Sequence, residues 1–306
     1  MTKKQETTVE DRRLTLTNLD KILWPDDHIT KAELIHYYLE VYSFLAKHLV
    51  GRPLVVTRYP DGIHGQHFYQ KDAPDYSPDW IRTCPLYSEE SKRVINYILA
   101  DDLPTICWLA NQACIELHPW MSPGSHLDYP DFAVLDLDPA GQTTYQDACT
   151  VALVLKQVLD ELNLFSLVKT SGATGLHIYL PVKPEYTYEE IRLFTRRIAE
   201  IVVELIPDQA TVIRQVKKRG NLVYVDYLQN VRGKTVCSPY SVRPRPHAPV
   251  STPLHWEEVP GSSPIDFTIR TVLPRLHQTG DLFAPVLENP QSLQNAWSRL
   301  GLPRRD

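Results

Sequence analysis

The stretch FAVLDLD, residues 132–138, largely decides the fold of this chain, because its alternating side chains mark a strand with one unusual face. Successive side chains of a strand point to opposite faces, so Asp136 and Asp138 share a face with Phe132 and Val134. The two carboxylates then leave the strand roughly 7 Å apart and point the same way. Burying two like charges is costly unless a cation lies between them, and hard ions such as Mg²⁺ or Mn²⁺ prefer carboxylate oxygens. The pattern therefore predicts either a divalent metal site or a strand end that faces solvent, where Pro139 ends the strand.

Outward from this strand, the second half of the chain alternates strands and helices in the order β-α-β-β-α-β. Apolar residues at helical spacing predict the first helix, and Thr187 with Glu190 forms a capping box that predicts the start of the second. The expected elements are a strand at 132–138, a helix near 144–162, strands near 164–169 and 176–182, a helix near 188–206, and strands near 211–215 and 222–228. This order predicts an α+β fold with a split βαβ (RRM-like) module. A last helix is expected from Ser263-Pro264 onward, where a capping residue precedes a proline.

The first part of the chain predicts an N-terminal α/β module packed on the split βαβ module. Thr30 and Glu33 form another capping box before an amphipathic run, and PLVVTR, residues 53–58, has the composition of a strand. We expect a polar tail at 1–13, one domain at 14–290 and a C-terminal tail at 291–306. Within the domain, the expected modules are 14–125 and 126–290.

Composition restricts the class of protein. The chain has 306 residues, 43% of them hydrophobic, so it can bury a sizeable core. No segment has the roughly 20 continuous apolar residues that span a bilayer, and the start has no apolar signal core, so we expect a cytoplasmic protein. The five cysteines form no CxxC pair, which predicts reduced, mostly buried thiols.

Charge is distributed unevenly along the chain. The net charge of −5 argues against a protein that coats DNA with its whole surface. The segment from Arg214 to Arg245 nevertheless contains eight basic residues and a single acid. Such a segment predicts a phosphate-binding stretch or a solvated basic face.

A second acidic strand strengthens the metal hypothesis. LVYVDYL, residues 222–228, sets one acid, Asp226, in an otherwise apolar strand. If it lies near the first strand, three carboxylates converge, enough to hold the two metal ions that assist phosphoryl transfer. Between them, KTSGATGLHIYLP, residues 169–181, has a tight turn at Ser171 and a strand that carries His177. Small residues let backbone N–H groups approach a phosphate, to which Ser171 and His177 can donate. A surface acid, a plain hairpin turn and a core histidine remain open alternatives.

Asp136-x-Asp138, then Ser171-Gly-x-x-Gly-x-His177, then Asp226, resembles the three motifs of the archaeo-eukaryotic primase superfamily. Further ordered blocks, from about Leu14 to Pro285, resemble the polymerase (primase-polymerase) domain of bacterial ATP-dependent DNA ligase D and its stand-alone relatives. They include NLDKILWP, TKAELIHYY, RPLVVTRYPDGI, FYQKDAP, ADDLPTICWLANQACIELHPW, VRGKTVCSPYSVRPRP and DFTIRT.

This resemblance implies a template-directed nucleotidyltransferase, a DNA-repair polymerase and primase. It would add ribonucleotides or deoxynucleotides to 3′ ends at gaps or breaks in non-homologous end joining. The implied cofactors are two divalent ions, Mn²⁺ or Mg²⁺. The implied partners are DNA with a 5′-phosphorylated gap or broken end, NTP or dNTP, and Ku with a separate DNA ligase, all at the nucleoid in the cytoplasm and without a membrane.

The resemblance also implies roles for individual residues. The implied catalytic metal ligands are Asp136, Asp138 and Asp226; the triphosphate contacts are Ser171, His177 and Arg243; His118 lies near the incoming nucleotide; Lys21 and Lys31 grip the 5′-phosphate across a gap; and Phe68 lies against template bases. Lys234 is added as a nucleotide-binding residue because of its charge and its closeness in sequence to Arg243. Gln229 stands where some relatives have arginine, and no role for it follows.

Two other functions fit part of these observations. A two-metal nuclease or phosphoesterase could use the same three carboxylates. It would have no need of the Ser171 turn, His177 and Arg243 together, a set suited to a triphosphate. A non-catalytic module that bridges DNA ends could bind DNA through Lys21 and Lys31 and carry a vestigial metal site.

Overall fold

The computed structural model describes residues 3–89 and 91–303. These residues form two compact units. Unit 1 comprises the chain up to residue 125 together with 235–251 and 265–280, and unit 2 comprises 126–234, 252–264 and the chain from 281 onward. In the described part of the chain, no helix is both long and apolar enough to cross a membrane. All five cysteines are free thiols and four of them are buried, as predicted from their spacing.

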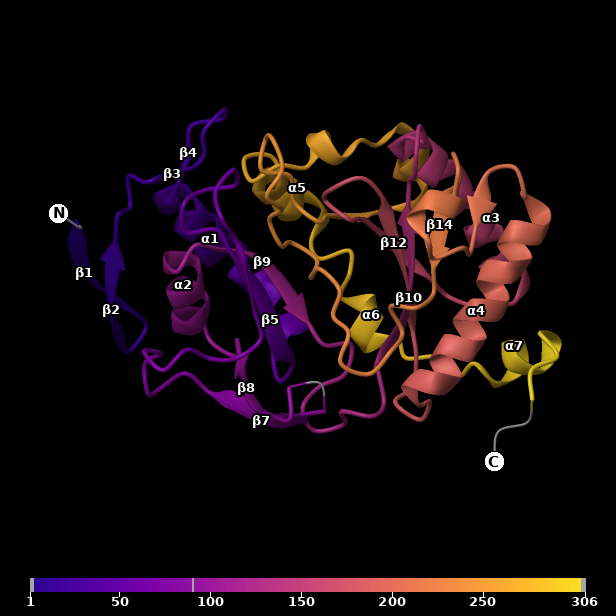
Figure 1. The fold of residues 1–306 in the computed structure, drawn as a ribbon, viewed down its shortest axis with the longest axis horizontal. Coiled ribbons are helices and arrows are strands. Elements are labelled where there is room, and N and C mark those ends of the chain that lie inside the picture. Colours follow the sequence, from indigo (N-terminus) through magenta and orange to yellow (C-terminus); the bar gives the residue numbers. More distant parts are fainter. Residues whose placement is uncertain (1–2, 90, 304–306) are drawn as a thin grey trace. The chain divides into compact units, whose positions relative to one another are not determined.

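Unit 2 is built on a six-stranded sheet in the order β13-β14-β10-β12-β11-β15. The strands are β10 (Phe132–Asp138), β11 (Leu167–Thr170), β12 (Leu176–Pro181), β13 (Ala210–Thr211), β14 (Val223–Asp226) and β15 (Pro253–Leu254). β10 is central and pairs antiparallel with β12 on one side and β14 on the other, as Figure 1 shows. The chain returns from β10 to β11, which lies beyond β12. The predicted split βαβ plan is therefore confirmed.

Two helices, α3 (Tyr145–Glu161) and α4 (Tyr188–Leu205), pack against each other and against this sheet. The capping box expected at the start of α4 is formed: the backbone N–H of Thr187 donates to Glu190 at 2.7 Å, and that of Glu190 donates to Thr187 Oγ1 at 3.3 Å. The side chains on the face of β10 that carries Leu135 are completely buried, because the apolar faces of the two helices pack there. By strand alternation, Asp136 and Asp138 belong to the opposite face.

Unit 1 has a five-stranded sheet centred on β5 (Pro53–Arg58). β9 (Cys114–Pro119) pairs with one edge of β5, while β8 (Arg93–Leu99) and β6 (Phe68–Gln70) pair with the other, and β7 (Thr83–Ser88) extends the sheet beyond β8. Two helices pack together in this unit, α1 (Lys31–Leu49) and α2 (Leu103–Asn111). The predicted capping box of Thr30 and Glu33 starts α1, whose buried face includes Leu34 and Leu45.

Short elements complete the two units. They are the hairpin of β1 (Lys4–Val9) and β2 (Arg12–Thr17), the pair β3 (Ile22–Trp24) and β4 (Ile29–Thr30), the helices α5 (Val272–Thr279), α6 (Pro285–Glu288) and α7 (Gln294–Arg299), and the 3₁₀ turns η1 (Val216–Lys218), η2 (Trp256–Gly261) and η3 (Pro264–Asp266).

The last helix begins later than the sequence predicts. Only the short turn η3 follows Ser263, and α5 begins at Val272. Between them, the backbone N–H of Thr268 donates to Thr271 Oγ1 at 2.8 Å and closes a local turn. The strand expected near 211–215 ends at Thr211 for a similar reason, because its hydroxyl accepts from the N–H of Ile213 at 3.1 Å.

The division of the chain also differs from the linear one expected. Residues 235–251 and 265–280 belong to unit 1, although they follow the split βαβ module in sequence. The expected N-terminal tail contains strand β1 at residues 4–9 and the first residues of strand β2, which begins at Arg12. The expected C-terminal tail contains α7, where the buried ring of Trp297 stacks on Phe194 with centroids 5.8 Å apart.

Candidate functional site

A row of titratable side chains crosses four strands of the unit 2 sheet. Asp136 lies directly opposite Asp226 on β14 and opposite His177 on β12, and Lys169 on β11 lies opposite His177 in turn. Directly opposite residues of adjacent strands project to the same face, so the four side chains share one side of the sheet. Asp138 lies two residues beyond Asp136 and shares that face. The structure thus brings the three carboxylates expected as a group onto neighbouring positions.

Protein donors hold the carboxylate of Asp226. The Tyr224 hydroxyl donates to Oδ1 at 3.0 Å, the backbone N–H of Leu228 donates to the same oxygen at 2.7 Å, and the Gln229 side chain reaches Oδ2 at 3.4 Å. Burial and the nearby Asp226 charge raise the pKa of Tyr224, so the phenol remains a donor at neutral pH. Gln229, to which the sequence assigned no role, is therefore a hydrogen-bond partner of a predicted metal ligand.

The chemistry and register of the three carboxylates fit divalent metal ions. They offer only hard oxygen donors, which Mg²⁺ and Mn²⁺ prefer, and aspartates opposite each other on adjacent strands repel unless a cation neutralises them. Within the described ranges, no three acidic, histidine or cysteine side chains converge as metal ligands. Instead, Asp136 Oδ1 faces His177 Nε2 at 3.3 Å, and Asp226 faces the donors given above. Metal binding would turn these carboxylates from protein donors toward the ions.

His177 is oriented by a buried lysine that the sequence analysis missed. Lys169 is completely buried, and its Nζ lies 2.8 Å from His177 Nδ1. The other ring nitrogen, Nε2, faces Asp136. An ionised carboxylate can only accept a hydrogen bond, so this network places the ring hydrogen on Nε2 and makes Nδ1 the acceptor for Lys169. A lysine inside the apolar strand LVKT was the signal available in the sequence.

The turn between β11 and β12 is organised by the Ser171 hydroxyl. Its Oγ accepts from the backbone N–H groups of Ala173 and Gly175, both at 3.1 Å. These two N–H groups, which the sequence offered for a phosphate, are thus used inside the turn. A hydroxyl has two acceptor positions and one hydrogen, so Ser171 can serve an anion as a donor. Gly175 is required here, because a Cβ at this position would lie 1.9 Å from the carbonyl oxygen of Leu137 on β10.

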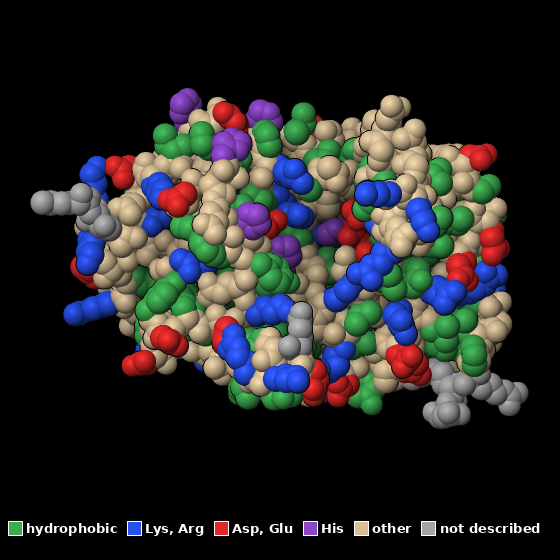
Figure 2. Space-filling view, viewed as in Figure 1, with side chains coloured by type: hydrophobic (Ala, Val, Ile, Leu, Met, Phe, Trp, Pro, Cys, Tyr) green, Lys and Arg blue, Asp and Glu red, His purple; other side chains and the backbone are tan. Residues whose placement is uncertain are grey.

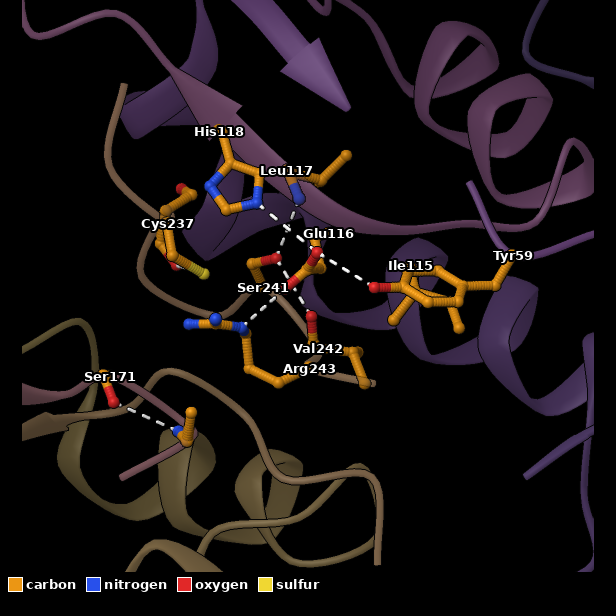
Figure 3. Close-up of polar contacts among 12 residues, drawn as sticks. Tyr59, Ile115, Glu116, Leu117, His118, Ser171, Cys237, Ser241, Val242 and Arg243 are labelled. Atoms are coloured by element: carbon orange, nitrogen blue, oxygen red, sulfur yellow. Dashed lines mark hydrogen bonds and ion pairs between the residues drawn. The ribbon is translucent and has the colours of Figure 1, made fainter. Parts of the chain in front are cut away.

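In unit 1, Glu116 joins two residues that the family resemblance connects with the nucleotide, as Figure 3 shows. Its Oε1 accepts from Arg243 Nε at 2.8 Å, while its Oε2 lies 3.7 Å from His118 Nε2 and 3.5 Å from the Tyr59 hydroxyl. Burial would raise the pKa of Glu116, but hydrogen bonds from His118 and Thr57 and the charge of Arg243 lower it to about 2. Glu116 is therefore a carboxylate throughout the physiological range, although no role for it follows from the sequence alone.

The structure brings Lys21 and Lys31 together at the start of α1. The backbone N–H of Lys31 donates to the Lys21 carbonyl at 2.8 Å. The Lys31 ammonium is buried and donates to Thr17 Oγ1 at 3.1 Å and to the Asn111 carbonyl at 3.0 Å, while Lys21 pairs with Asp61 at 2.7 Å. Burial and the nearby Lys21 charge lower the pKa of Lys31 to about 8.

Phe68, expected against template bases, lies on β6 with 46% of its surface exposed. The adjacent Tyr69 is also exposed, so two aromatic rings are available on this edge strand for stacking.

The basic segment is divided between the two units. Its residues up to 234 belong to unit 2, among them Lys234, whereas Arg243 and Arg245 belong to unit 1. In unit 2, the Arg219 guanidinium stacks 3.8 Å above the centroid of the Tyr224 ring, and Arg232 pairs with Asp128 at 2.6 Å. On the face seen in Figure 2, basic and acidic side chains are interspersed, consistent with a net charge of −5.

Comparison with known proteins gives the same family along most of the chain. Residues 30–283 match the family model described as the LigD primase-polymerase domain. The bifunctional non-homologous end joining protein LigD of Bacillus subtilis is 38% identical over 282 residues, 91% of this chain and 45% of that protein. The multifunctional non-homologous end joining protein LigD of Mycolicibacterium smegmatis is 30% identical over 276 residues, 90% of this chain and 36% of that protein.

A solved structure shows the same fold. The polymerase domain of Mycobacterium tuberculosis ligase D, in complex with DNA, superposes with a TM-score of 0.84 at 27% identity, covering 92% of this chain and all of that one. The fold is accordingly of the archaeo-eukaryotic primase type. The chain spans less than half the length of these two LigD proteins. On the family match and the structural similarity together, the chain belongs to the LigD primase-polymerase domain family.

Proposed function

We propose that the protein is a template-directed polymerase that adds nucleotides to DNA 3′ ends at gaps or breaks during end joining. The observation that carries this proposal is the register of β10, which sets Asp136 between Asp226 and His177 on one face of the sheet. Three carboxylates beside a serine turn and a histidine form a set suited to divalent ions and a triphosphate. The membership in the LigD family supports the same reaction.

In the proposed reaction, the 3′-hydroxyl oxygen attacks the α-phosphorus of the nucleotide. One phosphodiester bond forms, the bond to the β-phosphate oxygen breaks and pyrophosphate leaves. Asp136, Asp138 and Asp226 would hold two Mn²⁺ or Mg²⁺ ions, which when bound promote loss of the hydroxyl proton and stabilise charge on the leaving pyrophosphate. Ser171 and His177 donate hydrogen bonds to phosphate oxygens, His177 through the hydrogen that Lys169 directs to Nε2.

The remaining residues bind substrates. Arg243, His118 and Lys234 contribute to nucleotide binding, and Arg243 suits phosphate because a guanidinium presents a fork of donors. Lys21 and Lys31 bind the 5′-phosphate at the far side of a gap, at the N-terminus of α1, where the helix dipole also favours an anion. Phe68 stacks on template bases. Ku and a DNA ligase are the proposed protein partners, at the nucleoid in the cytoplasm.

The test is extension of a primer at a 5′-phosphorylated single-nucleotide gap, with Mn²⁺ or Mg²⁺ and each NTP or dNTP supplied alone. We expect addition of only the nucleotide that matches the template, with NTPs used in preference to dNTPs. A matched reaction without nucleotide separates the alternatives, because a nuclease would shorten the primer there. Binding of the gapped duplex without any extension would favour the non-catalytic bridging module and refute the polymerase proposal.

A further inference from the structure

Glu116 places a negative charge beside two residues that are assigned to the nucleotide, Arg243 and His118. It is 7% exposed, and its Oε1 accepts from Arg243 Nε while His118 lies on its other side. A buried carboxylate beside residues that bind a triphosphate repels the substrate, so its charge alone would weaken nucleotide binding. The residue must contribute something that outweighs this repulsion.

Geometry supplies that contribution. Glu116 lies opposite Thr57 on β5, and its two oxygens are engaged on different sides, by Arg243 at one and by His118 and Tyr59 at the other. The contact with Arg243 uses Nε, and Figure 3 shows the two terminal nitrogens of this side chain extending away from the carboxylate. An arginine held through Nε loses rotamer freedom before a ligand arrives, and this lowers the entropy cost of binding.

We propose that Glu116 is a positioning residue that holds Arg243 and His118 in the arrangement in which they bind the incoming nucleotide. Glu116 itself does not touch the substrate. The inference rests on the proposed polymerase function and on the assignment of Arg243 and His118 to the nucleotide. The Glu116 side chain stays negatively charged at physiological pH, because its pKa lies far below neutrality.

The decisive variant is Glu116→Gln, which keeps the size and one acceptor oxygen but removes the negative charge. A positioning role and a purely electrostatic role predict opposite changes in nucleotide affinity for this variant. A purely electrostatic role predicts tighter nucleotide binding, because the repulsive charge is gone. The positioning role predicts that the KM for GTP opposite template C rises about tenfold, or about 1.4 kcal/mol, while kcat changes less than about threefold.

A double-mutant cycle identifies the partner through which Glu116 acts. In an Arg243→Ala background, Glu116→Gln should raise KM by clearly less than tenfold, because one of the two groups that it positions is already absent and only His118 remains. The matched control is Asp72→Asn, which breaks another carboxylate–arginine pair of unit 1, that with Arg93, and should leave the KM unchanged. Affinity for the gapped duplex should be the same in all these variants.

The outcomes separate the inference from the function on which it rests. If the wild type extends primers and Glu116→Gln shows an unchanged or lower KM, the positioning role is refuted and the polymerase function stands. A fall in kcat at constant KM also refutes it. If the wild type extends nothing, both are refuted. Should Glu116→Gln fail to fold, Thr57→Val decides, because it removes one hydrogen bond to Glu116 and should raise KM about threefold.

Discussion

The lowered pKa of Lys31 predicts an unusual pH dependence for recognition of the 5′-phosphate. The Lys31 side chain is buried, and burial together with Lys21 lowers its pKa from 10.5 to about 8. A phosphate monoester has a second pKa near 6 and is a dianion throughout the alkaline range. Of these two groups, only the lysine therefore titrates between pH 7 and pH 9.5, and loss of its charge removes the contribution of Lys31 to the attraction for the phosphate.

The magnitude follows from the fraction of protein that still carries the ammonium. With a pKa of about 8, this fraction is about one tenth at pH 9 and about one thirtieth at pH 9.5. The part of the preference for the phosphorylated gapped duplex that Lys31 provides should fall by the same factors, down to the level that Lys21 supports. For a lysine with the ordinary pKa of 10.5, the ratio would stay level over this range. Because the folded protein releases this proton earlier than the unfolded chain, the free energy of unfolding should rise between about pH 8 and pH 10.5.

The assay is fluorescence anisotropy of the two duplexes, titrated with protein from pH 6.5 to pH 9.5 at constant ionic strength. Lys31→Arg is the matched control, since a guanidinium remains charged at every pH of the series and the ratio should not change with pH. Lys31→Met should lower the ratio to a level that does not change with pH and that Lys21 alone supports. A wild-type ratio that is constant up to pH 9.5 would contradict the reasoning, either about the buried ammonium or about its contact with the phosphate.

Three further predictions concern unit 2. Asp136→Asn should abolish extension and the Mn²⁺-induced rise in Tm while leaving the metal-free Tm equal or higher, because it removes a repulsive charge; extension above a tenth of the wild-type rate would exclude it as a metal ligand. Lys169→Met should raise the KM for NTP about tenfold, because His177 loses the hydrogen bond that orients its ring. The ¹⁵N NMR signals of the ring should then show a different tautomer, and signals identical to the wild type would contradict the role given to Lys169. Gly175→Ala should cost at least about 2 kcal/mol of stability, as its Cβ would meet β10, whereas Gly261→Ala, with nothing within 4 Å, should be near neutral in the same calorimetric comparison.

Much of the local structure of this protein depends on short segments of sequence and could be predicted from them. The capping boxes at Thr30 and Thr187 start helices α1 and α4, and alternation in FAVLDLD places Asp136 and Asp138 on one face of a strand. Where the prediction was wrong, a nearby threonine hydroxyl accepts a backbone N–H that the expected helix or strand would use in its own hydrogen bonds. Thr271 accepts a backbone N–H where a helix was expected, and Thr211 does so where a strand was expected to continue.

The candidate site depends on pairings that no local pattern specifies. Asp226 stands 90 positions after Asp136, and only the antiparallel register of β14 with β10 sets them opposite each other. Lys169 and Glu116 were missed because their partners, His177 across a strand pair and Arg243 far along the chain, become visible only in the fold. A lone charged residue in a strand has the same local sequence whether it faces water or a partner.

From the sequence alone one could predict most of the strands and helices of the split βαβ module, the side chains that share a strand face, and the family to which the chain is similar, because these depend on spacing and composition. The return of segments 235–251 and 265–280 to unit 1, and the contacts by which Glu116 and Lys169 each hold a predicted site residue, become visible in the folded chain alone. The physical reason is that burial and long-range pairing select among many locally equivalent arrangements. The folded arrangement leaves few buried charges without a partner, and the partners come from distant segments, so no single segment can specify them.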